Sequence, residues 1–147
     1  MQEVVDLTFY KPVIDVTLAP AFIPISTPLI IGFSHDPDQL VDVLTHELWH
    51  ILFTDNNVTP NANRKLLAHW QKLYGKDHKF RTLVHIPVHA GLKYIYLDVL
   101  NAPERLEKDK EFCKKLDGYT EAWDYVETND YHQILGGLKK MYKTLQT

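Results

Sequence analysis

Hydrophobic and polar positions alternate with a period of two in the first third of the chain. Ile14, Val16 and Leu18 alternate with polar residues, which is the pattern of a strand with one buried face. Apolar runs rich in β-branched residues also occupy 4–9 and 29–33. Prolines interrupt these runs, and proline cannot donate to a sheet ladder, so the strands are expected to be short or at an edge. The pattern predicts a small N-terminal sheet, mixed or antiparallel.

The spacing of apolar residues becomes helical after Phe33. Asp36 is a candidate N-cap and Pro37 a candidate first helical residue, so a helix is expected from Asp36 to about Phe53. Strands first and helices after predict an α+β fold in a single domain over 1–147. The further helices are expected over 61–74 and 87–100, from Pro103, and between Tyr119 and Leu145.

Composition narrows the class of protein. The chain has 147 residues, 45% of them hydrophobic, which is enough for one core. A net charge of -3 disfavours nucleic acid as a partner, and no apolar run approaches the roughly 18 residues of a membrane span. A single cysteine, Cys113, excludes an internal disulfide framework. With no secretory signal at its acidic start, the chain is expected to be cytoplasmic.

The helix that starts at Asp36 contains a motif with a chemical meaning. Residues 46–50 read His-Glu-Leu-Trp-His, the HExxH pattern. At about 100° per residue, His46 and His50 lie about 40° apart on one helix face, so both imidazoles can bind one metal ion. Glu47 falls beside that ion without being a ligand, where it can take a proton from water. The motif predicts a Zn²⁺ cofactor, with His46 and His50 as ligands and Glu47 as general base.

The motif and the apolar strand before it, 29–33, resemble the active-site region of zincin-type metallopeptidases. The resemblance covers about a fifth of the chain, and it implies a zincin-like fold and a zinc-dependent peptidase. The extended metzincin motif is absent, because the residues after His50 read Ile-Leu-Phe-Thr-Asp-Asn. The subfamily is therefore open, with gluzincins and other small zincins both compatible.

A third zinc ligand has to come from outside the motif. If Pro87 opens a helix, His89 lies in its first turn on the apolar stripe, and we predict His89 as the third ligand. His85 lies nearby and is the candidate donor to the oxyanion of the tetrahedral intermediate. Two alternatives stay open: His85 itself as the ligand, or Glu127, which flanks the apolar stripe of the helix that begins at Tyr119.

The function predicted from these residues is hydrolysis of peptide bonds by metal-activated water. The expected partner is a peptide or protein substrate, and no membrane or nucleic acid is expected. An alternative of a different class is a catalytically silent, zincin-like regulatory or partner-binding module, in which a metal is bound without turnover. The sequence leaves the oligomeric state open.

Overall fold

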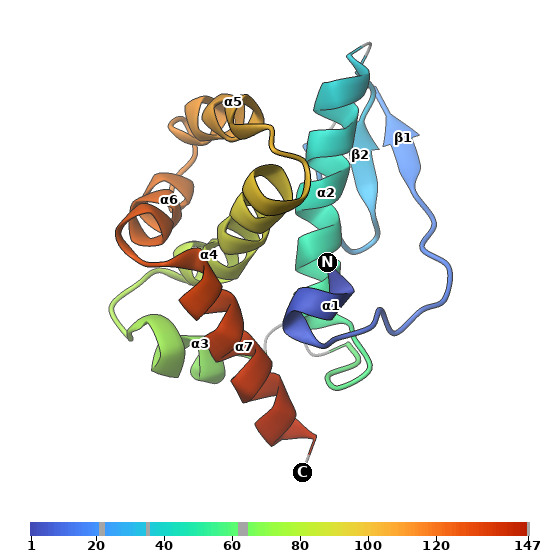
Figure 1. Ribbon diagram of the computed structural model, residues 1–147. Coiled ribbons are helices and arrows are strands. Elements are labelled where there is room, and N and C mark those ends of the chain that lie inside the picture. The colour runs from blue at the N-terminus through green and yellow to red at the C-terminus, as the bar shows by residue number, and fades with distance from the viewer. Residues whose placement is uncertain (21–22, 35, 62–64, 147) are drawn as a thin grey trace.

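The computed structural model describes residues 1–20, 23–34, 36–61 and 65–146. These residues form a helical protein with a small sheet packed beside one helix (Figure 1). The architecture is α+β, as predicted. None of the described helices combines the length and apolarity that crossing a membrane requires. The elements, in chain order, are α1 Gln2–Val5, β1 Thr17–Ala19, β2 Ile30–Gly32, α2 Pro37–Thr54, α3 Leu67–Tyr74, α4 Phe80–Lys93, the π-helical η1 Tyr94–Val99, α5 Pro103–Cys113, α6 Tyr119–Thr128 and α7 Tyr131–Leu145.

The sheet differs from the prediction in two ways. β1 and β2 are parallel, with Thr17 opposite Ile30, so the predicted mixed or antiparallel pairing is wrong for these strands. The reason is the connection between them: Ile25 and Ile30 exchange two backbone hydrogen bonds, and this turn sends β2 in the direction of β1. The first apolar run, 4–9, contains the end of α1 instead of a strand.

α2 follows the predicted boundaries closely. Asp36 caps its N-terminus by accepting a hydrogen bond from the backbone N–H of Asp38, at 3.0 Å. Pro37 stands at the first helical position, where its missing N–H costs nothing. The helix ends at Thr54, and β2 packs against it through Leu29, Ile31 and Ile51. The strand-then-helix order expected around the motif is therefore present.

α4 is the central helix and contacts α2, α3, α6 and α7 (Figure 1). It begins at Phe80, seven residues before the predicted start, and Pro87 lies inside it. A proline within a helix costs about 3 kcal/mol, because it removes one hydrogen bond and crowds the preceding turn. That cost is offset here by burial, since every residue from Thr82 to Leu92 is buried.

A glycine allows α2 and α4 to approach each other. A Cβ added at Gly91 of α4 would lie 2.4 Å from Cε2 of Trp49, which is fully buried on α2. The two backbones can therefore be this close only because Gly91 has no side chain. This contact determines the spacing between the HExxH helix and the helix that carries His85 and His89.

Gly91→Ala is expected to destabilise the protein by about 1–3 kcal/mol, because the new methyl group would overlap the Trp49 ring. The matched control is Gly136→Ala on α7, where an added Cβ meets nothing within 4 Å. That change should stabilise the helix by about 0.5–1 kcal/mol. Chemical denaturation of both variants checks this, and a Gly91→Ala variant as stable as Gly136→Ala would contradict the close approach.

Candidate metal centre

The HExxH residues lie on the inner side of α2. His46 and Glu47 are buried and His50 is half-buried. The Nε2 atoms of His46 and His50 are 3.2 Å apart. Two imidazoles on one tetrahedral zinc ion, each at 2.0–2.1 Å, place their nitrogens about 3.3 Å apart. The pair therefore already has the separation that a shared zinc ion requires.

α4 brings a third imidazole to this pair. The His85 ring centre lies 4.8 Å from that of His50 and 5.4 Å from that of His46. Its Nδ1 is 2.7 Å from the backbone oxygen of Arg81, so Nδ1 carries the proton and donates. Nε2 then has a lone pair, yet it is buried without a hydrogen-bond partner. A ligand histidine is usually oriented in this way, by a hydrogen bond from its other ring nitrogen.

The three histidines form a compact donor set. Candidate ligand atoms of His46, His50 and His85 all lie within 4.8 Å of one another. All three are imidazoles, a donor set that suits Zn²⁺. The orphaned Nε2 of His85 and the close Nε2 pair of α2 thus fit one metal ion.

The other two candidate ligands lie elsewhere. His89 belongs to a different group of side chains, and its ring centre is 6.0 Å from that of His46. Glu127 forms ion pairs with Lys110 at 3.0 Å and Lys93 at 3.4 Å. The geometry thus favours His85 over both as the third ligand, whereas the sequence-based choice of His89 relied on a helix starting at Pro87.

Burial controls the charge state of the three imidazoles in the protein without metal. It lowers the pKa of His46 to about 3 and that of His85 to about 4, and His85 adds to the effect at His46. The pKa of His50 is also well below its ordinary value, first because of burial and then because of His46 and His85. All three rings are therefore neutral near pH 7, which is the form that binds a metal ion.

Tyr119, the first residue of α6, covers the centre. The centre of its ring lies 3.7 Å from the ring centre of His85. It lies 6.2 Å from the ring centre of His46, and the Tyr119 and His46 rings are nearly parallel. Burial, with a smaller contribution from the Glu47 charge, raises the pKa of Tyr119 to about 12. Burial also raises the pKa of the Glu47 carboxyl to about 7. At neutral pH the Glu47 carboxyl can therefore release its proton and act as a base, whereas the Tyr119 hydroxyl stays protonated.

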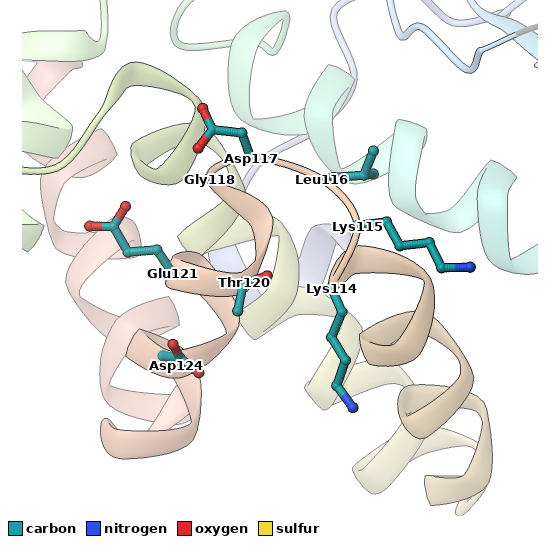
Figure 2. A pocket seen from close by; sticks show the side chains of 8 residues that line it. All are labelled: Lys114, Lys115, Leu116, Asp117, Gly118, Thr120, Glu121 and Asp124. Atoms are coloured by element: carbon teal, nitrogen blue, oxygen red, sulfur yellow. The ribbon is translucent and has the colours of Figure 1, made fainter.

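A close contact between the start of α6 and α4 determines the position of Tyr119. Gly118 precedes it with φ of +82°, and a Cβ there would lie 3.1 Å from Arg81 and 3.3 Å from Thr82 on α4. The start of α6 thus lies directly on α4, one turn from His85. Figure 2 shows the connection from α5 to α6, which lines a shallow surface pocket. The pocket is lined by Lys114, Lys115, Leu116, Asp117, Gly118, Thr120, Glu121 and Asp124.

A larger cavity of about 570 Å³ opens on the centre. His46, Glu47 and Tyr119 contribute to its wall. α5 is held across the cavity from α2 by Arg105, whose guanidinium lies 2.5 Å from the Asp42 carboxylate. The remaining lining residues are mostly apolar or acidic, with one lysine and one glutamine: Ile23, Pro24, Asp36, Asp38, Gln39, Asp42, Val43, Lys108, Asp109, Phe112, Cys113 and Leu116.

Sequence reasoning missed the position of His85 within α4 and the position of Tyr119 beside it. Recognising that Pro87 could lie inside a buried helix would have placed His85 and His89 on one face, one turn apart. No pattern in the sequence indicates where Tyr119 lies, because its position depends on how α6 packs on α4.

No protein-family model matches the chain, and neither does a curated protein or a solved structure.

Proposed function

We propose that the protein is a zinc-dependent hydrolase and, on the HExxH pattern, a peptidase. The observation that carries this proposal is the buried Nε2 of His85, which lacks a partner and lies next to two Nε2 atoms 3.2 Å apart. His46, His50 and His85 would hold the ion. Three protein ligands leave one coordination position open, which is the arrangement of catalytic zinc sites, whereas structural sites have four.

A zinc ion in this site would supply a Lewis acid that lowers the pKa of a coordinated water to about 7. Glu47 is the residue that would move the proton. Its carboxylate would take one proton from the water that attacks the carbonyl carbon, and it would return that proton to the leaving amine. A carboxyl with a pKa of about 7 is suited to both steps at neutral pH.

Tyr119 is the candidate donor to the developing oxyanion. Its position in the wall of the cavity that Glu47 also lines supports this assignment, and its pKa of about 12 keeps the hydroxyl protonated. The role was predicted for His85 from the sequence. With His85 as a metal ligand, Tyr119 replaces it as the group that stabilises charge on the carbonyl oxygen.

The test is incubation of the zinc-loaded protein with a mixture of unstructured peptides, with the products identified by mass spectrometry. Cleavage by the wild type and none by Glu47→Gln is the expected result. Intact peptides with zinc bound at His46, His50 and His85 would instead favour a regulatory module that holds a partner segment without turnover.

A further inference from the structure

A second group of metal-ligating side chains lies beside the first. It consists of His89 on α4 and of Asp109 and Cys113 on α5, and their candidate ligand atoms all lie within 4.8 Å of one another. His89 is one helical turn from His85, and their ring centres are 5.6 Å apart. The two groups are therefore neighbours, although they share no residue.

His89 has no partner of its own. Its side chain is completely buried, and neither Nδ1 nor Nε2 makes a hydrogen bond within the described structure. The ring is instead held by stacking on Trp123, at 4.3 Å and an angle of 13°. A buried polar atom left unpaired costs about 1–3 kcal/mol, so a partner for one of these nitrogens is expected.

Asp109 and Cys113 are positioned to supply that partner jointly with His89. The Cys113 thiol donates to Oδ2 of Asp109 at 3.4 Å, and the Trp123 indole N–H donates to the same oxygen at 3.0 Å. The carboxylate is thus oriented by two donors. Both Asp109 and Cys113 also line the 570 Å³ cavity onto which His46 and Glu47 open. A solvated ion can therefore reach the group through the cavity.

We propose that His89, Asp109 and Cys113 bind a second divalent transition-metal cation of the Zn²⁺ class. The donor set of one imidazole, one carboxylate and one thiolate favours such a cation over Ca²⁺ or Mg²⁺, which take oxygen ligands. Water from the cavity completes the coordination. When the cation binds, the Sγ–H bond breaks, the proton leaves to solvent and an Sγ–metal bond forms. The charges of Asp109 and of the Cys113 thiolate then neutralise the cation.

This second site goes beyond the proposed function and does not depend on hydrolysis. It would link α4 directly to α5, the helix that forms one wall of the cavity. The ion pair between Arg105 and Asp42, by contrast, ties α5 to α2.

The experiment is exchange of the purified protein into Co²⁺ alone, with bound metal counted and the absorption spectrum recorded without any substrate. We expect two equivalents of Co²⁺ and a near-ultraviolet thiolate-to-Co²⁺ charge-transfer band. Cys113→Ser should lose the band and one equivalent, and Asp109→Asn should weaken binding of that same equivalent. The double variant His46→Ala/His50→Ala should keep the band, because its ligands belong to the other group.

Each other outcome overturns the second site. Folded wild-type protein without the band would remove Cys113 from any metal centre, and a band that persists in Cys113→Ser would assign it to a different source. A band that disappears in the His46→Ala/His50→Ala protein would place Cys113 on the first cation. Far-ultraviolet circular dichroism confirms folding, and His89→Asn serves where the Cys113 variant is unfolded. Because no step uses a substrate, failure of peptide cleavage leaves this result unchanged.

Discussion

Glu47→Gln is expected to reduce peptide hydrolysis by at least about 10²–10⁴-fold, the range that general acid–base catalysis typically contributes. The amide has nearly the same shape as the carboxyl but cannot accept the proton from the attacking water. Zinc content should stay at one equivalent in the first centre, because the three imidazoles of His46, His50 and His85 are unchanged. Initial rates at several peptide concentrations, with zinc measured on the same samples, check both parts.

The matched control is Glu104→Gln, which makes the same chemical change at an exposed position in the first turn of α5. Its cleavage rate should equal that of the wild type. If Glu47→Gln cleaved peptides as fast as Glu104→Gln, Glu47 would have no part in the mechanism. If it lost its zinc, the carboxylate would belong to the ligand set and not to the base.

Removal of zinc is expected to abolish cleavage and to lower the thermal stability. A ligand present at about 100 times its dissociation constant stabilises the folded state by about 2.7 kcal/mol. For a domain of this size that corresponds to a fall in Tm of about 5–10 °C after chelation. Differential scanning fluorimetry with and without a chelator measures it, and re-addition of zinc should restore both Tm and activity. A chelated protein with unchanged Tm and full activity would contradict the metal centre.

The stability of the zinc-free protein should also fall as the pH is lowered. Burial holds the pKa of His46 at about 3 and that of His85 at about 4 in the folded state, against about 6.5 in the unfolded chain. The unfolded state therefore binds more protons, and stability is lost progressively from pH 6.5 toward the folded values. Glu47 acts in the opposite direction between about 4.5 and 7, because its pKa is raised. The pKa values of His50 and His89 are lowered as well, so the imidazoles dominate below pH 6.

Local signals in the sequence predict the boundaries of α2 and the relative positions of His46 and His50. Asp36 as the cap and Pro37 as the first helical residue depend only on neighbouring backbone groups, so the start of α2 was predicted to within one residue. The separation of His46 and His50 follows from helix geometry alone. The spacing of apolar residues along a helix likewise indicates which face is covered, and the core contains Trp49, Trp70, Trp123 and Cys113.

The remaining parts depend on contacts between distant segments. Pro87 normally indicates a helix start, and the burial of α4 on several sides overrides that preference. Because the helix was expected to start at Pro87, His85 was placed before it, and His89 was preferred as the third ligand. Similarly, Gly91 and Gly118 allow helices to approach closely, but nothing in the chain indicates which partner each one meets. The position of Tyr119 over His85 follows from the second of these approaches.

The most direct test of the central proposal is X-ray diffraction at the zinc absorption edge from crystals of the zinc-loaded protein. We predict an anomalous peak about 2.0–2.1 Å from a ring nitrogen of each of His46, His50 and His85, with Glu47 next to it but outside bonding distance. A protein whose zinc lies only at the surface, or whose three rings are hydrogen-bonded to one another with no ion between them, would contradict the proposal.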